Sequence, residues 1–198
     1  MVSALAEKKE RELIKDDHWI NFLRCIGFVK LGGRLYIPAR LKLLKKGIDL
    51  TRMKIRVAEI TDIPAMHRIR LAVRENVLTN PLAVQEADYV PYLTQIGKGW
   101  VCERGGELLG FAIVDLENKN VWALFVDPAS EGQGLGSALH DGMLVWYFSQ
   151  TDVPLHLGTA AGTKAELFYQ KRAWEKVGVE SNGDITFIMP RKPLHLSS

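Results

Sequence analysis

The chain has 198 residues, of which 47% are hydrophobic and 25% are charged, the balance of a folded protein with one main core. No apolar run approaches the ~18 residues that a membrane-spanning helix needs, and the first thirty residues lack the uninterrupted apolar segment of a signal peptide. We therefore expect a cytoplasmic protein with no membrane partner.

The distribution of charge divides the chain near residue 52. Residues 1–52 hold 12 of the 26 Lys and Arg and 6 of the 23 Asp and Glu, a net charge of +6; this leaves 14 basic and 17 acidic side chains, net −3, for residues 53–198. We expect a basic N-terminal extension, which is either a packing segment or a partner-binding arm, followed by the main domain. The total charge of +3 is too small to indicate nucleic acid as a partner.

Within the extension, the pattern predicts a helix over residues 4–25 and a hairpin over residues 28–37 that turns at Gly32 and Gly33. A basic helix over residues 39–46 follows. A piece this short cannot bury much surface alone.

The main domain starts with a strand over residues 54–57. A capping side chain followed by Pro64 then marks the start of a helix that runs to about residue 75. After a polar loop, residues 85–96 predict a second helix, bent near Pro91 and ended by two glycines, Gly97 and Gly99.

Three strands come next, over residues 100–103, 108–116 and 121–126. The first two are joined by Gly105 and Gly106, which supply the positive φ of a tight hairpin, so the three strands predict an antiparallel meander. The last three residues of the third strand are all apolar, which predicts burial on both faces and a central position.

A glycine-rich loop leads into a helix over residues 137–148, then a strand over 155–157 and a helix over 164–172. Residues 176–179 and 185–189 close the domain as an antiparallel pair. The predicted order is β-α-α-β-β-β-α-β-α-β-β, an α/β (α+β) fold.

The cysteines and histidines indicate no metal site. Cys25 and Cys102 lie far apart and outside any Cys-x-x-Cys or Cys/His spacing, so we expect two free thiols. His67, His140 and His156 are scattered, and we interpret them as structural or surface residues.

The glycine-rich loop, residues 131–136, is the strongest chemical signal. It joins a strand to a helix start, where unpaired N–H groups and the positive end of the helix dipole favour a phosphate. The loop lacks the Gly-Lys-Ser/Thr of a Walker site, and Gly-x-Gly-x-Gly does not match the dinucleotide fingerprint Gly-x-Gly-x-x-Gly. Both common nucleotide folds are therefore disfavoured.

Two segments together resemble the GCN5-related N-acetyltransferase (GNAT) superfamily. The first is Phe-Val-Asp-Pro at 125–128, the loop 131–136 and Ser-Ala-Leu at 137–139, similar to the family's strand, Gln/Arg-x-x-Gly-x-Gly/Ala loop and helix. The second, residues 165–174, is similar to Ala-x-x-Leu-Tyr-x-Lys-x-Gly-Phe. The resemblance implies a GNAT-like mixed, mostly antiparallel sheet flanked by helices over residues 54–190, with the small N-terminal extension outside it.

The resemblance implies an N-acetyltransferase that uses acetyl-CoA as cosubstrate and no metal. The amides of Phe125 and Val126 would pair with the pantetheine arm, where their strand splays from its neighbour. The pyrophosphate would be bound by the loop and first helical turn: Gly132, Gln133, Gly134, Leu135, Gly136 and Ser137. Glu131 stands where the family has Gln or Arg, so its carboxylate has to point outward or pair with a basic side chain.

The resemblance also implies that Tyr169 acts as general acid toward the departing thiolate, since a phenol with a pKa near 10 stays protonated at pH 7. The family's glutamate base is absent here. Asp115 and Glu117 are candidates for the base, with a water chain or a backbone carbonyl as open alternatives. The oxyanion would be met by a backbone N–H near Val126.

The acceptor side remains open. Arg74, Asn76, Tyr89 and Trp122 are the candidate substrate contacts, and the acceptor is a small-molecule or protein amine. A homodimer is also left open. The alternative function is a non-catalytic acyl-CoA-binding sensor.

Overall fold

The computed structural model describes residues 30–31, 34–35, 53–77, 80 and 83–190. In the extension it contains the antiparallel pair of β1 (Lys30–Leu31) and β2 (Arg34–Leu35), with Lys30 opposite Leu35. This is the pairing that the sequence predicts for the hairpin. The turn of that hairpin and the two helices expected at residues 4–25 and 39–46 lie outside the described residues.

The main domain is built on a seven-stranded sheet in the order β3-β4-β5-β6-β7-β9-β8. Its strands are β3 (Met53–Val57), β4 (Gly97–Arg104), β5 (Glu107–Asp115), β6 (Asn120–Val126), β7 (Leu155–Ala160), β8 (Glu175–Val179) and β9 (Asp184–Met189). All neighbouring strands are antiparallel except β6 and β7, which are parallel. The predicted mixed, mostly antiparallel sheet and its element order are confirmed.

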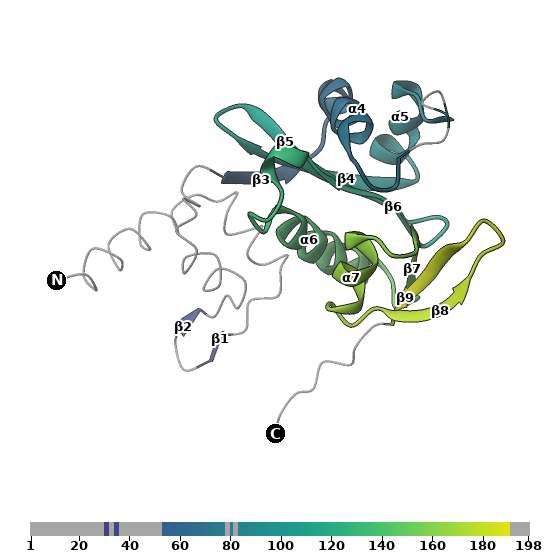
Figure 1. Cartoon of the computed structure of the whole chain (residues 1–198). Helices are drawn as coiled ribbons and strands as arrows, with labels where there is room; N and C mark the ends of the chain where they lie inside the picture. The colour runs from purple at the N-terminus through teal and green to yellow at the C-terminus, as the bar shows by residue number, and fades with distance from the viewer. Residues whose placement is uncertain (1–29, 32–33, 36–52, 78–79, 81–82, 191–198) are drawn as a thin grey trace.

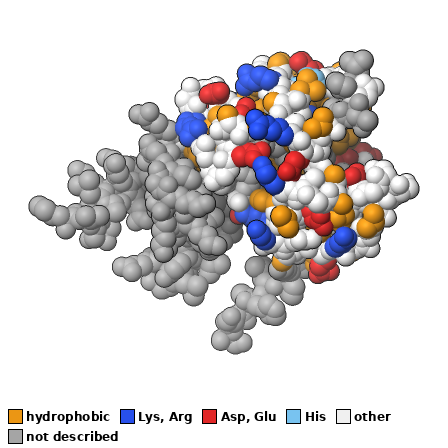
Figure 2. All heavy atoms as spheres, in the orientation of Figure 1, with side chains coloured by type: hydrophobic (Ala, Val, Ile, Leu, Met, Phe, Trp, Pro, Cys, Tyr) orange, Lys and Arg blue, Asp and Glu red, His pale blue; other side chains and the backbone are white. Residues whose placement is uncertain are grey.

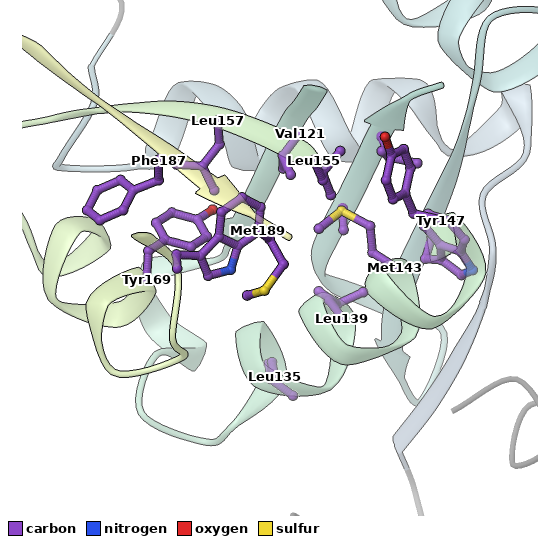
Figure 3. Packing of buried hydrophobic residues seen from close by; sticks show 14 of the residues in the cluster. Val121, Leu135, Leu139, Met143, Tyr147, Leu155, Leu157, Tyr169, Phe187 and Met189 are labelled. Carbon is purple, nitrogen blue, oxygen red and sulfur yellow. The ribbon is translucent and has the colours of Figure 1, made fainter. Parts of the chain in front are cut away.

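Helices cover both faces of this sheet (Figure 1). On one face lie α4 (Ile63–Ala72) and α5 (Glu86–Thr94), and on the other lie α6 (Leu135–Gln150) and α7 (Lys164–Gln170). Each face has its own cluster of buried apolar side chains. Figure 3 shows Leu139, Met143 and Tyr147 of α6 pointing at the strands, which is the helical spacing that the sequence predicts.

Asp62 does not cap α4 with its side chain, contrary to the simplest interpretation of the helix start. Its carboxylate instead accepts the N–H of Glu59 (2.8 Å) and closes a 3-10 turn, η2 (Ile60–Asp62), and it also accepts two bonds from Arg56. The helix ends at Ala72, three residues earlier than predicted.

Gly97 and Gly99 belong to β4 and do not end the preceding helix. A Cβ at Gly97 would lie 2.0 Å from the carbonyl oxygen of Val114, and one at Gly99 would lie 2.4 Å from Leu93. Glycine is therefore required at position 97, where backbone atoms of β5 and α5 approach too closely for any side chain, whereas a side chain at position 99 would need the Leu93 side chain to shift.

The strand buried on both faces is β5, in which every residue from Leu108 to Asp115 is buried. β6 holds the middle position in the sheet, as predicted, but its last three residues, 124–126, are only half-buried. The expectation of full burial there is wrong because β7 separates from β6 along this stretch.

Candidate active site

β6 and β7 pair only where they begin. Asn120 lies opposite His156, and the His156 N–H donates to the carbonyl of Lys119 at 2.8 Å. No further pair joins the two strands in the described part of the chain. The edge of β6 that faces β7 is thus without a strand partner from Val121 to Val126.

Backbone alternation decides which groups of β6 face this opening. The Asp127 N–H donates to the carbonyl of Leu109, on the β5 side, at 2.8 Å. Because in-plane backbone groups alternate along a strand, the N–H and carbonyl of Phe125 also face β5, whereas those of Leu124 and Val126 face the opening.

At the end of β6, a 3-10 turn, η4 (Pro128–Ser130), leads into the glycine loop. Gly132 and Gly134 adopt φ of 74° and 82°, the left-handed values that the glycine pattern predicts. The N–H groups of residues 131–137 donate no hydrogen bond within the described part of the chain. The next amide, that of Ala138, bonds to the carbonyl of Gly134 at 3.1 Å.

These free donors coincide with the positive end of α6, which starts at Leu135, two residues before the predicted position. A run of unpaired N–H groups at the start of a 16-residue helix is the arrangement that binds phosphate groups.

The carboxylate of Glu131 forms an ion pair with Lys164 (2.9 Å), so it does not face the loop as an unpaired charge. On the other side of the loop, Arg104 donates to the side-chain oxygen of Gln133 at 3.1 Å. Both contacts leave the amides open and place basic side chains around them, which favours an anion.

Tyr169 is buried among aromatic side chains of α7, β9 and the segment after α7. Its ring lies 5.4 Å from that of Trp174 and 6.2 Å from that of Phe187, and Figure 3 shows it beside Phe187 and Met189. Burial raises the pKa of the phenol, so the hydroxyl stays protonated at neutral pH. No hydrogen bond to that hydroxyl is formed within the described residues.

A buried histidine holds the neighbourhood of Tyr169 in place. The indole N–H of Trp174 donates to Nε2 of His140 at 2.9 Å, so the ring proton lies on Nδ1 and is donated to Asp141 at 2.8 Å. Arg172 pairs with the same carboxylate at 2.6 Å, and burial lowers the pKa of His140, which favours the neutral ring. This series of hydrogen bonds connects α6 to the segment that follows α7.

The two candidate bases lie in and beside the β5–β6 turn. One carboxylate oxygen of Asp115 accepts the backbone N–H of Asn118 (2.8 Å), and the other accepts its side-chain amide (2.7 Å). The buried Asp115 is thus engaged in forming the turn. Glu117 is exposed on the same turn. Neither the position of Asp115 nor that of Glu117 identifies it as the general base.

The candidate substrate contacts fall into two groups. Asn76 connects the loop after α4 to β7: its amide donates to the Thr159 hydroxyl (3.0 Å) and accepts the N–H of Ala160 (3.1 Å). Tyr89 packs edge-on against Trp122 of β6, with ring centroids 5.0 Å apart. Arg74 is exposed. Their roles toward a substrate stay predictions.

Sequence reasoning missed Leu124, whose backbone faces the opening, and Arg70, whose guanidinium carbon lies 4.5 Å from the centroid of the Phe125 ring. A signal for Arg70 was available. It follows the fully buried Met66 by four residues, so a charged side chain occupies the inward face of the helix.

Comparison with known proteins identifies a related domain. Residues 95–176 match the family model described as an acetyltransferase (GNAT) domain. No curated protein matches the chain. The matched residues include the glycine loop and Tyr169.

Solved structures share the fold over about 70% of the chain. The ribosomal-protein-S18-alanine N-acetyltransferase from Escherichia coli is 20% identical, covers 70% of this chain and 93% of its own, and gives a TM-score of 0.58. An N-acetyltransferase from Staphylococcus aureus Mu50 is 18% identical, covers 71% of this chain and 99% of its own, and gives a TM-score of 0.61. The putative acetyltransferase yncA from Salmonella typhimurium, solved with its cofactor acetyl-CoA, is 18% identical, covers 74% of this chain and 98% of its own, and gives a TM-score of 0.59.

The resemblance to GNAT acetyltransferases is thereby confirmed, and the domain match together with the fold supports an acyltransferase. Within the described residues, no helix is long and apolar enough to span a membrane, and no group of three His, Cys, Asp or Glu side chains could hold a metal ion. Figure 2 shows basic and acidic side chains intermixed over the described surface on the face in view.

Proposed function

We propose that this chain transfers the acetyl group of acetyl-CoA to a primary amine by direct attack of the amine on the thioester. The observation that carries the proposal is the set of free amides at residues 131–137, placed where β6 ends and β7 has already diverged. A diphosphate bound there directs its attached arm along an unpaired strand edge.

The cosubstrate would be bound almost entirely by backbone groups. The amides from Gly132 to Ser137 would bind the pyrophosphate, whose negative charge is favoured at the start of α6. The pantetheine amides would pair with the free edge of β6. Since the amide of Phe125 faces β5, we assign this pairing to Leu124 and Val126.

The reaction needs no covalent enzyme intermediate. The lone pair of the neutral amine forms a C–N bond to the thioester carbon, and the C–S bond then breaks to release the thiolate of CoA. The thiolate takes a proton from Tyr169, whose buried phenol holds one at neutral pH. The proton lost by the amine goes to water or a carboxylate, and a free N–H of β6 would stabilise the oxyanion.

Calorimetry with CoA and acetyl-CoA tests the binding half of the proposal. We expect saturable binding of both, weakened when the 3′-phosphate and diphosphate are removed, as in pantetheine. An assay of thiol release from acetyl-CoA with a panel of primary amines tests the transfer.

Each result is decisive. No detectable affinity for CoA would contradict the proposal as a whole. Binding of CoA without thiol release for any amine would instead support the non-catalytic acyl-CoA sensor.

A further inference from the structure

Three polar side chains on the α4/α5 face have buried atoms without a hydrogen-bond partner in the described part of the chain. They are His67 Nδ1, Arg70 Nη1 and the hydroxyl of Tyr89. His67 and Arg70 are three residues apart on α4 and therefore lie on one side of that helix. Buried polar groups are nearly always paired, so three orphans together require a reason.

The three side chains lie over β6, the strand that borders the opening. The guanidinium of Arg70 stacks on the ring of Phe125, and Tyr89 packs against Trp122. The ring of His67 contacts that of Tyr89 edge-on, with centroids 5.9 Å apart. The cluster thus lies on the opposite face of the sheet from α6, close to the strand edge that we assign to the pantetheine arm.

Of the three residues, Arg70 costs the most free energy to leave without a partner, because it is charged. Arg56 and Arg172 both pair with carboxylates, whereas Arg70 has no ion pair within the described residues. Its contact with the Phe125 ring attracts the cation but cannot accept its N–H groups. An anion from outside the chain would satisfy the guanidinium, and the Tyr89 hydroxyl could donate to the same anion.

We propose that the acceptor amine carries a carboxylate, and that Arg70 binds this carboxylate with Tyr89 as a second donor. The inference rests on the proposed acetyl transfer and names its substrate class. A guanidinium matches the planar geometry of a carboxylate, and its single positive charge balances a single negative charge, whereas a phosphate monoester carries nearly two. A polyamine would be repelled by Arg70.

The test compares each amino acid with its carboxamide, which has the same shape and the same amine but no negative charge. Acetyl transfer is measured for α-, β- and γ-amino acids and their carboxamides with the whole protein. We expect kcat/KM to be about 10- to 100-fold higher for the best acid than for its amide, as for loss of a charge-assisted bond.

Arg70→Met keeps the length of the side chain and its packing on Phe125 while removing the charge. In this variant, we expect the acid to lose its advantage, so that the ratio of kcat/KM for the acid to kcat/KM for its amide falls to about one. Arg68→Met is the matched control, because Arg68 is exposed on the same helix and its loss changes the net charge equally.

The possible outcomes separate this inference from the proposed function. If acids and amides react equally in the native protein, or if both lose kcat/KM equally in Arg70→Met, the inference that the acceptor carries a carboxylate is wrong. The proposed acetyl transfer would not be affected by that result. Turnover of amines that lack a carboxylate, with none of any acid, would contradict the inference in the same way. Absence of all turnover would defeat the proposed function, and the inference with it.

Discussion

Tyr169 is the residue for which we propose the role of general acid. Its position in the second motif indicates a general acid, while its position in a helix equally suits a packing role. In the structure, the ring packs with Trp174 and Phe187, and the hydroxyl has no hydrogen-bond partner within the described residues, so it is free to serve as a donor. Burial keeps the phenol protonated and therefore able to donate.

Tyr169→Phe should lower kcat by about 100- to 10,000-fold, the usual contribution of a general acid, because the thiolate would leave without a proton donor. The affinity for CoA and the melting temperature should change little, since the ring is retained and its hydroxyl forms no bond in the described part of the chain. Single-turnover acetyl transfer, calorimetry and thermal unfolding measure the three quantities. Tyr147→Phe, which removes another unpaired buried phenol far along α6, is the control. An unchanged kcat would exclude Tyr169 as the acid.

At the scale of elements, local patterns predicted most of what was found. Alternation, helical spacing and the glycine pair at 105–106 gave the element order and the hairpin, because these signals depend on neighbours in the chain. The separation of β6 from β7 was implied only by the family resemblance, since local patterns do not say where a strand about thirty residues later joins the sheet. The roles of Gly97 and Gly99 were likewise set by contacts with distant elements.

The partial burial of Arg70 illustrates the same limit. Its spacing from Met66 was visible in the sequence, but its closeness to Phe125 depends on how α4 crosses β6. The glycine loop, in contrast, was predictable because a strand, positive-φ glycines and a helix start are all local features.

The start of α6 gives a prediction at this scale. Gly134→Ala places a Cβ at φ 82°, which costs about 1 kcal/mol and turns the neighbouring amides away from one another. We therefore expect a lower affinity for CoA, about 10-fold or more, together with a small loss of stability. Gly105→Ala is the control: Gly105 also has a positive φ (61°), but it lies in the β4–β5 turn, so it should cost stability alone. Equal CoA affinity in the two variants, measured by calorimetry, would argue against the loop as the binding site.

At the scale of the whole molecule, a network of ion pairs joins β3, the first strand of the main domain, to β4 and to the turn before α4. Arg56 of β3 donates to Glu103 of β4 (2.9 Å) and through two nitrogens to Asp62 (2.6 and 2.8 Å). This network links the boundary that we predict between extension and domain to the helix whose inward face carries Arg70. Nothing in the structure tests whether residues 53–198 fold without the extension, so that boundary stays a prediction.

The network should make the stability of the protein depend on pH. Hydrogen bonding from Arg56 holds the pKa of Asp62 below its ordinary value of 3.8, against the opposing effect of burial. A carboxyl with a depressed pKa in the folded state stabilises the fold above its unfolded pKa, and this contribution is lost as the pH falls through the folded value. Asp62→Asn, which keeps the shape but removes the charge, should cost about 2 kcal/mol at pH 7. The difference from the native protein should shrink steadily below pH 3.8.

Urea unfolding of both proteins between pH 2.5 and 7 measures this difference, with Asp88→Asn as the control. Asp88 is also an acidic residue at the start of a helix, but it is exposed and has no basic partner within the described residues, so its substitution should cost less and vary less with pH. A gap between native and Asp62→Asn proteins that stays constant to pH 2.5 would contradict this prediction, because the contribution of Asp62 would then not depend on the ionisation of its carboxyl group.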